Sequence, residues 1–471
     1  MTPDLSRYAR SREHQARAHA LIPGGAHTYA KGDDQMPEPM PVVIERGEGC
    51  RVWDVDGNEY VEYGMGLRAV TLGHAEPRVN AAAARMMAAG LNFTRPASVE
   101  LEAAEAFVDL IPGAERVKFC KDGSSATTAA IKLARAATGR DLVAMCGDHP
   151  FLSQDDWFMG TTDMNAGIPQ AVRDLSIPFA YGDAEALRAV FSAHPGQIAC
   201  VILEAVRGPE DPSAYMREVR EICDREGAVF ILDEMITGFR WDRHGAQGLF
   251  GIEPDLSSFG KALANGFACS AVAGRAEIMD LGGLTTEADR VFLLSATHGA
   301  ETVGLGAALE TMRIYREEDV TGQLHAIGAR LREGVREVTE AHGVGEFVGT
   351  AGRDCNLVFF TRDPEGRPSQ PFRTLFLQEM TARGVLAPSF VVSTAHDDRA
   401  LAQTLDALDG ALAVYARALD AGTTDGFLIG RPVQPVFRRK NGTVWSPEPG
   451  ASGDGASLAP SRLVRATPHR S

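Results

Sequence analysis

The sequence predicts an α/β protein in which a mostly parallel, buried sheet carries the functional site at one edge. An apolar run at 228–232 has the length of a buried parallel strand and ends at Asp233. A second short run, 256–259, ends in Gly260 and then Lys261, which lies 28 residues after Asp233. In an open parallel sheet, ligands bind outside the carboxyl ends of the strands, so an acid and an amine arrive at the same edge.

Composition sets the broad class of the protein. The 471 residues are enough for a large core and more than one domain, and 44% hydrophobic with 23% charged residues is typical of a globular protein. A net charge of −16 argues against nucleic acid as the main partner. No apolar run has the length of a membrane span, and the N-terminus lacks the apolar segment of a signal peptide, so we expect a cytoplasmic protein without a membrane partner.

The seven cysteines show no pair with the spacing of metal ligands. They indicate reduced thiols, and no metal site is expected.

The first half of the chain contains three further local signals. An amphipathic helix is predicted at about 5–20, and alternating apolar residues around Asp56-Gly57 predict a β-hairpin. After the strand ERVKFC, the turn KDGSSAT places a glycine and hydroxyl residues at the start of a long helix. Such a helix start binds anions through its backbone N–H groups and dipole, although taken alone it is usually only an N-cap.

DEMITGFR followed by PDLSSFGKALANG resembles the core signature of class III (subgroup II) aminotransferases. These are enzymes of fold type I that depend on pyridoxal 5′-phosphate (PLP). WDVDGNEY and Gly73-His74 near the N-terminus, and S-x-x-H near the C-terminus, extend the likeness from about residue 23 to about residue 414. Within this class the chain looks most like glutamate-1-semialdehyde 2,1-aminomutase and its relatives in specialised metabolism.

The resemblance implies a large PLP-binding domain with a mostly parallel seven-stranded sheet, together with a smaller α/β domain. The boundaries that follow are an N-terminal segment at 1–75, the large domain at 76–318 and the C-terminal small domain at 319–420. Residues 421–471 are rich in Gly, Pro and Ser, so a docked strap to about residue 439 and a disordered tail are expected there.

The resemblance implies that two residues carry the chemistry. Lys261 would hold PLP as a Schiff base and then act as base and acid in proton transfer. Asp233 would keep the pyridine nitrogen protonated, so that the ring draws electrons from the breaking Cα–H bond. Taken alone, Asp233 at a strand end would be an N-cap or an ion-pair partner, and its combination with Lys261 favours the catalytic role.

The resemblance also implies a set of residues around the cofactor. They are Gly123 and Ser124 at the phosphate, Met235 packed on the ring and Glu204 near the cofactor's edge. Phe151 is the predicted ring-stacking residue, with His149 as the competing candidate, and Phe151 as an ordinary core residue is the alternative to both.

Thr297 matches a family threonine that reaches the phosphate of the neighbouring subunit, which implies a homodimer with shared sites. A Thr N-cap is the alternative.

The substrate pocket departs from the family pattern. Lys31 stands where aminomutases carry a carboxylate-binding Arg, and Arg68 lies where they carry a pocket aromatic residue. Lys31, Arg68 and His149 are therefore the candidates for substrate binding, and an exposed surface charge is the alternative for Lys31 and Arg68.

The expected reaction is transfer of an amino group from a donor amine to an aldehyde or ketone acceptor by way of pyridoxamine phosphate. A glutamate-1-semialdehyde-type aminomutase is the first alternative, because it uses the same half-reactions on one molecule. A PLP-dependent lyase or decarboxylase and a catalytically silent binding protein follow. The intact Asp233 and Lys261 count against the silent protein.

Overall fold

A computed structural model describes residues 4–205 and 210–439 of the chain. The chain divides into a compact unit, Met1–Arg438, and a second unit, Arg439–Ser471. The disorder predicted for the tail beyond about residue 439 lies outside the described residues.

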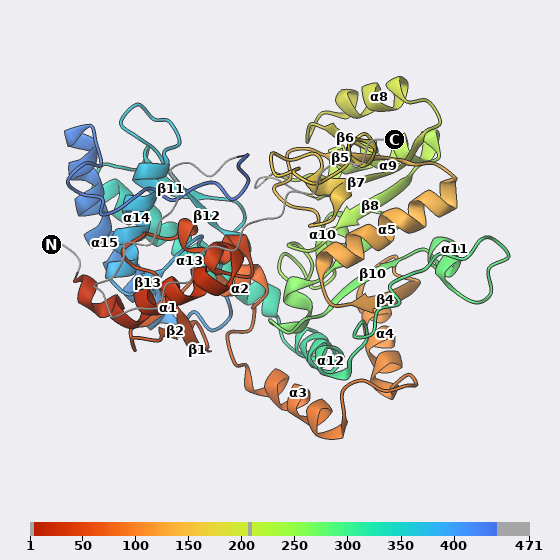
Figure 1. Ribbon diagram of the computed structural model, residues 1–471, viewed down its shortest axis with the longest axis horizontal. Coiled ribbons are helices and arrows are strands. Elements are labelled where there is room, and N and C mark those ends of the chain that lie inside the picture. The colour runs from red at the N-terminus through yellow and green to blue at the C-terminus, as the bar shows by residue number, and fades with distance from the viewer. Residues whose placement is uncertain (1–3, 206–209, 440–471) are drawn as a thin grey trace, which may run out of the picture. The chain divides into compact units, whose positions relative to one another are not determined.

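A seven-stranded sheet forms the centre of one part of the first unit, with the order β4-β10-β9-β8-β7-β5-β6 (Figure 1). Neighbouring strands are parallel except that β10 runs antiparallel to both β4 and β9. The predicted mostly parallel seven-stranded sheet is therefore confirmed. The strands are β4 (Arg116–Cys120), β5 (Leu142–Cys146), β6 (Ser176–Phe179), β7 (Ile198–Glu204), β8 (Val229–Asp233), β9 (Leu256–Phe259) and β10 (Ser270–Gly274).

Both faces of the inner part of this sheet are buried, because residues of β5, β7, β8, β9 and β10 enter two different hydrophobic clusters. In β8, for example, Phe230 and Leu232 pack on one side, whereas Val229 and Ile231 pack on the other. Helix α5 (Gly123–Thr138) belongs to the second cluster, and α4 (Ser98–Leu110), α9 (Ser213–Glu226) and α12 (Thr302–Glu317) belong to the first.

The other helices of this part are α3 (Pro77–Ala89), α6 (Asp156–Met159), α7 (Gln170–Arg173), α8 (Ala184–Ala193), α10 (Gly245–Phe250) and α11 (Ala276–Met279).

The N-terminal segment joins the C-terminal part of the chain in a second, four-stranded sheet of order β1-β2-β3-β13. The predicted hairpin forms β2 (Arg51–Asp54) and β3 (Glu59–Glu62), and β3 pairs in parallel with β13 (Val385–Leu386). At its turn, Asp56 accepts hydrogen bonds from the backbone N–H groups of Arg10 and Ser11 at 2.7 and 2.8 Å. The hairpin thereby satisfies donors at the start of α1 (Ala9–Leu21).

The remaining elements are α2 (Met65–Arg68), β1 (Ile44–Glu48), α13 (Val320–Ala341), β11 (Val348–Ala351), β12 (Val358–Thr361), α14 (Gln370–Ala382) and α15 (Asp398–Ala421). From residue 422 to residue 439 the chain has no regular structure and is tied down by hydrogen bonds such as Val433 N–H to Thr374 Oγ1 at 2.9 Å. Within the described ranges, no helix combines the length and the apolar character needed to cross a bilayer.

Candidate active site

Two carboxylates stand side by side at the carboxyl edge of the large sheet. Glu204 ends β7, Asp233 ends β8, and the two are paired in register. On its other side Asp233 is in register with Ser258 of β9. Both carboxylate residues are buried, at 8% and 1% exposure. Two residues beyond the last residue of β9 comes Lys261, so the sheet brings the predicted acid and amine to one edge.

Burial and mutual attraction act in opposite directions on the Asp233 and Lys261 pair. Burial raises the pKa of the Asp233 carboxyl, while the Lys261 charge opposes that rise. Burial also lowers the pKa of the Lys261 amine, and the charges of Asp233 and Glu204 oppose the fall. A buried amine with a lowered pKa has a larger neutral, nucleophilic fraction than a surface lysine.

Local hydrogen bonds hold the Asp233 carboxylate, and Lys261 has an unusual backbone conformation. Asp233 Oδ1 accepts from Ser258 Oγ at 2.9 Å and from the Met235 N–H at 3.0 Å. Lys261 begins a short 3₁₀ helix with a φ of 45°, a left-handed value that is uncommon for a residue with a side chain. Such conformations are concentrated at functional sites, where the surrounding structure holds them in place.

Met235 connects three of the predicted motifs. A Cβ atom on Gly123 or on Gly260 would lie 2.7 Å from the Met235 sulfur, so a side chain at either position would force Met235 to move. Gly123 begins α5, and Gly260 precedes Lys261. The thioether therefore lies between the helix start and the lysine, two residues after Asp233.

An acidic residue caps the start of α5. Asp122 accepts from Ser125 N–H at 2.9 Å and from Ser125 Oγ at 2.8 Å, so its carboxylate serves as the N-cap. The buried Ser124 hydroxyl accepts from the Gln154 N–H at 2.9 Å and ties the following long loop to the helix. The positive end of the α5 dipole thus lies beside Met235.

The structure separates the two ring candidates. His149 is buried, its Nε2 accepts from the Glu204 N–H at 3.1 Å, and its Nδ1 lies 3.9 Å from Glu204 Oε2. Phe151 is 46% exposed, and its ring meets Phe158 edge to face at 6.0 Å. His149 is therefore part of the strand-end cluster, and which ring stacks on a cofactor stays a prediction.

The three remaining candidates have different surroundings. Arg68 lies close enough to Lys261 for its charge to lower the amine's pKa, and the Glu204 charge acts on Arg68 in turn. Lys31 is exposed at the end of a short 3₁₀ helix. Thr297 is exposed in a turn before α12. The structure brings only Arg68 of these three to Lys261.

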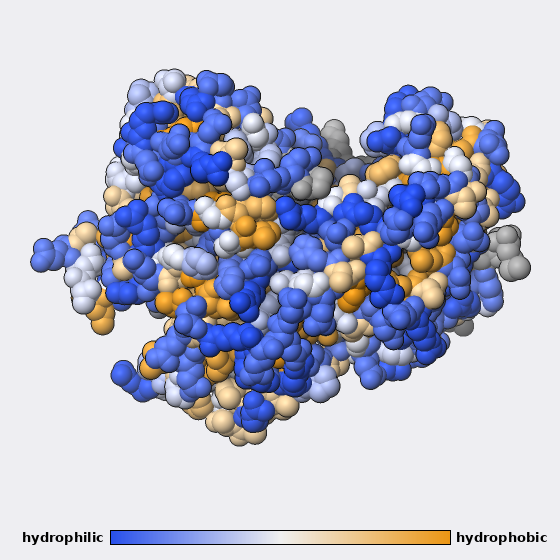
Figure 2. Space-filling view, turned by 180° about the vertical axis from the view of Figure 1, so that it is seen from behind, coloured by the Kyte–Doolittle hydropathy of each residue, from blue (hydrophilic) through white to orange (hydrophobic). Residues whose placement is uncertain are grey.

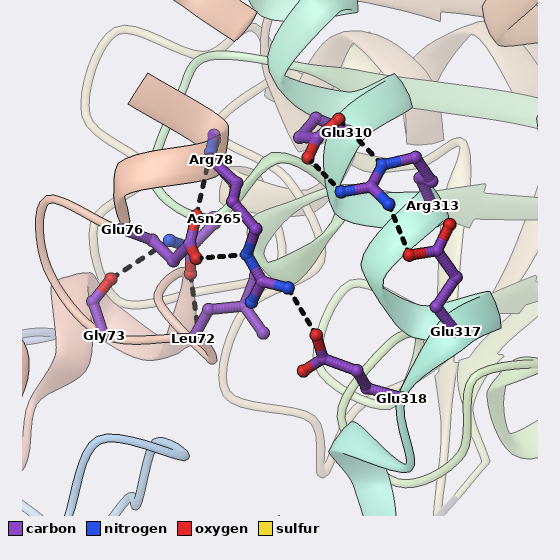
Figure 3. Close-up of polar contacts among 10 residues, drawn as sticks. Leu72, Gly73, Glu76, Arg78, Asn265, Glu310, Arg313, Glu317 and Glu318 are labelled. Atoms are coloured by element: carbon purple, nitrogen blue, oxygen red, sulfur yellow. Dashed lines mark hydrogen bonds and ion pairs between the residues drawn. The ribbon is translucent and has the colours of Figure 1, made fainter. Parts of the chain in front are cut away.

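Asn265 is a residue of the site that motif reading did not single out. Its Oδ1 accepts from the N–H groups of Thr71 and Leu72 at 3.0 Å each, and its Nδ2 donates to Gly73 O at 3.0 Å (Figure 3). It fixes the segment after Arg68 to the turn that carries Lys261. Its φ of 44° is a left-handed value that asparagine tolerates well.

Arg240 is a second residue that motif reading did not single out, and its buried side chain joins three segments of backbone. Its guanidinium donates to the carbonyls of Cys355 at 3.1 Å, Val392 at 3.0 Å and Arg68 at 3.1 Å. Burial lowers the pKa of Arg240 to about 10. Asn265 and Arg240 both lie inside the quoted motifs KALANG and DEMITGFR, but only the contacts reveal what they hold.

Comparison with known proteins agrees with this arrangement. The family model for class-III aminotransferases matches residues 30–401. Glutamate-1-semialdehyde 2,1-aminomutase of Natronomonas pharaonis is 35% identical over 371 residues, covering 76% of this chain and 81% of the relative. The enzyme of the same name from Chloroflexus aggregans is 32% identical over 442 residues, covering 88% of this chain and all of the relative.

Solved structures give the same picture. The FumI protein of Sphingopyxis sp. MTA144, described as a PLP internal aldimine form, superimposes with a TM-score of 0.80 at 30% identity, covering 89% of this chain and all of that one. An omega-transaminase from Sphaerobacter thermophilus has a TM-score of 0.77 at 27% identity, with 86% and 98% covered. The matched family model and these relatives show that the chain belongs to the class-III aminotransferase family.

Proposed function

We propose that this chain is a PLP-dependent aminotransferase that moves an amino group from a donor amine or amino acid to an aldehyde or ketone acceptor. The single observation that carries the proposal is the pair of Asp233 and Lys261 at neighbouring strand ends of a fold-type I sheet. The cofactor is pyridoxal 5′-phosphate. When bound, it supplies an electron sink for the substrate carbon that loses a proton.

The residues of the site fit this cofactor. The buried Asp233 carboxylate suits a protonated pyridine nitrogen, and the capped start of α5 at Gly123 and Ser124 suits a phosphate. Met235 lies between that helix start and Gly260, where it can pack on a ring. Glu204 and His149 form a buried polar pair at the edge of the same cluster.

Lys261 has two tasks in this proposal. Its amine would hold the cofactor, and a lowered pKa and a flexible stem suit that task. As a free amine, Lys261 Nζ would take the proton from the substrate carbon that bears nitrogen and deliver it within the same site. Both Nη atoms of the neighbouring Arg240 donate to backbone carbonyls, those of Cys355, Val392 and Arg68, so we assign it a positioning role and no proton transfer.

Intramolecular transfer is the second candidate. The curated relatives that carry the aminomutase name favour it, at 35% and 32% identity. The family resemblance implies an arginine and an aromatic residue in the substrate pocket, and this chain has Lys31 and Arg68 in their places. This difference favours the two-substrate reaction.

We also infer a homodimer that shares its sites. Thr297 is exposed, and it follows a segment with the exposed apolar side chains of Leu284 and Phe292, at 86% and 71%. The face drawn in Figure 2 is largely hydrophilic with separate apolar patches. Apolar patches of this kind suit a protein partner, and the family resemblance makes a second copy the expected one.

The visible spectrum of the purified holoenzyme tests the reaction. We expect a yellow protein whose absorbance bleaches stably with one amino donor and returns when an aldehyde or ketone acceptor is added. Lys261→Ala should lack both the absorbance and the turnover. A protein that no donor bleaches, but that rearranges a single amino aldehyde, would establish the aminomutase alternative, and a colourless protein in the presence of PLP would contradict the assignment of Lys261.

A further inference from the structure

A cavity of about 350 Å³ lies beside Arg68. Its walls come from the turn after β3, from β12 and α14, and from the chain beyond α15. The volume is in the range of small-molecule sites. None of its lining residues is acidic, whereas two of them, Arg68 and Arg373, carry a positive charge, and glutamine side chains supply further polar groups.

Arg68 is held at this cavity by a strained backbone. Met65, Gly66, Leu67 and Arg68 have φ values of 42°, 60°, 58° and 74°, which make a left-handed turn. Such a turn costs roughly 1–2 kcal/mol for each residue other than glycine. The Met65 N–H donates to both carboxylate oxygens of Glu62 at 2.8 Å, and Arg240 holds the Arg68 carbonyl, so the surroundings impose the conformation.

Arg373 reaches the same cavity from α14. Its guanidinium lies over the ring of Phe359, 4.6 Å from the centroid, and one Nη donates to Pro388 O at 2.9 Å. Arg68 is fixed in a similar way, since its Nε donates to Asn356 Oδ1 at 2.9 Å. Each guanidinium is therefore oriented by neutral groups.

Neither charge is neutralised where it stands. Across residues 4–205 and 210–439, no Asp or Glu oxygen lies within 4 Å of the Arg68 or Arg373 guanidinium. Burial lowers the pKa of both groups, with only the Glu204 charge opposing this for Arg68. Partly buried cations without an anion are costly, and a planar guanidinium is suited to a carboxylate.

We propose that Arg68 and Arg373 together bind a carboxylate of the substrate, so that the enzyme acts on amines or carbonyl compounds that carry a carboxylate away from the reacting carbon. The proposal rests on the proposed function, because it names the substrate class of the same site. Anion recognition is thereby assigned to Arg68 and Arg373 and not to Lys31, whose side chain is exposed while its neighbour Ala30 lines the cavity.

Binding calorimetry on the PLP-loaded enzyme tests the pocket without turnover. Glutarate, its neutral analogue glutaramide and inorganic phosphate are the probes. We expect glutarate to bind more tightly than both of the others, and Arg68→Gln and Arg373→Gln each to weaken glutarate binding about 10- to 100-fold, as for a lost charge-assisted hydrogen bond. Arg399→Gln, which removes an exposed charge from α15, is the matched control and should bind glutarate as the wild type does.

A matched pair of donors, 4-aminobutyrate and butylamine, tests the same assignment in the reaction. In the wild type, 4-aminobutyrate should bleach the yellow absorbance faster than butylamine. The ratio of the two rates should fall about tenfold in each arginine variant. Unchanged glutarate affinity in both variants would overturn the proposal, and so would tighter binding of phosphate than of glutarate. If no donor bleaches the wild type while glutarate binding still depends on both arginines, the proposed aminotransferase function is wrong, but the assignment of carboxylate binding to Arg68 and Arg373 remains supported.

Discussion

Asp233 is a buried carboxylate whose direct partners are a hydroxyl and a backbone N–H group. Burial raises its pKa, and the Lys261 charge only partly opposes this. A protonated pyridine nitrogen beside Asp233 would supply the cation that favours the ionised form. We therefore propose that Asp233 stabilises a positive charge on the cofactor.

Asp233→Asn is therefore expected to lower kcat by on the order of 10²–10³, the loss typical of removing one preorganised electrostatic partner. The yellow absorbance should remain, because Lys261 is intact. Steady-state kinetics with the best donor measure the loss. Asp224→Asn, which changes an exposed carboxylate on α9, serves as the control. Full activity in the Asp233 variant would contradict the role.

His396 is a second buried titratable residue, and it acts on stability. Its Nδ1 accepts from the Ser393 N–H at 3.0 Å, its Nε2 lies 3.2 Å from Glu62 O, and its ring packs on Tyr63 with centroids 4.5 Å apart. Burial lowers the pKa of His396 to about 4. The folded protein therefore binds fewer protons here than the unfolded chain, whose histidine pKa is about 6.5.

The free energy of unfolding should consequently fall as pH drops below about 6.5, down to pH 4, through His396. At pH 5 this amounts to about 2 kcal/mol relative to pH 7.5. Chemical unfolding at both pH values should show that the loss is about 2 kcal/mol smaller in His396→Gln, which cannot titrate. An identical pH dependence in the two proteins would show that the imidazole is not kept neutral by the fold.

Among the elements, the 3₁₀ helix Lys261–Ala264 depends on the residue that follows it. Asn265 ends this helix in a left-handed conformation and binds the backbone of three consecutive residues, 71–73. Figure 3 shows this clamp beside the ion pairs of Arg78 and Arg313. The element that carries the lysine is thereby fixed to the segment that follows Arg68.

Asn265→Ala should lower the free energy of unfolding by about 2–4 kcal/mol, from the lost hydrogen bonds and the less favourable left-handed backbone. Asn265→Gly removes the same hydrogen bonds but accepts the backbone conformation, so it should be less destabilised than the alanine variant. Chemical unfolding of the apoprotein measures both. Equal stability of the alanine variant and the wild type would show that the clamp contributes nothing.

At the scale of the whole molecule, the segment around Thr297 is the expected contact with a second copy of the chain. Asn92 Nδ2 lies 3.4 Å from His298 Nδ1, and the Thr302 N–H donates to Leu91 O at 3.0 Å. These contacts place the Thr297 turn beside the exposed Leu91 and a further exposed residue, Phe93. A second copy that covers these apolar side chains would also cover Thr297.

Mixing two inactive proteins tests the shared site. Lys261→Ala and Thr297→Ala each alter one contribution to a site, and a mixed dimer regains one site with both native residues if Thr297 acts in the partner. We expect the co-refolded mixture to recover a substantial part of the activity that Thr297→Ala alone lacks. Sedimentation should show a dimer. A monomeric, fully active protein would contradict the inferred homodimer.

The sequence alone was sufficient for the parts of the fold that depend on local patterns. Continuous apolar runs of strand length require burial on both faces, and the structure buries β7 and β8 completely. The Asp56-Gly57 turn and the glycine-hydroxyl start of α5 follow from local turn and capping chemistry. The placement of Asp233 and Lys261 at one edge of the sheet was predictable because parallel strands bring their carboxyl ends together.

Contacts between distant residues could not be read from such patterns. The ring candidates His149 and Phe151 are two residues apart, and only the folded chain shows that one is buried beside Glu204 and the other exposed. The approach of Arg373 to Arg68 joins positions more than 300 residues apart and depends on how α14 packs. Local sequence determines hydrogen bonding and periodicity within an element, whereas side-chain environment depends on every segment packed around it, so only the tertiary structure decided the shape and charge of the pocket.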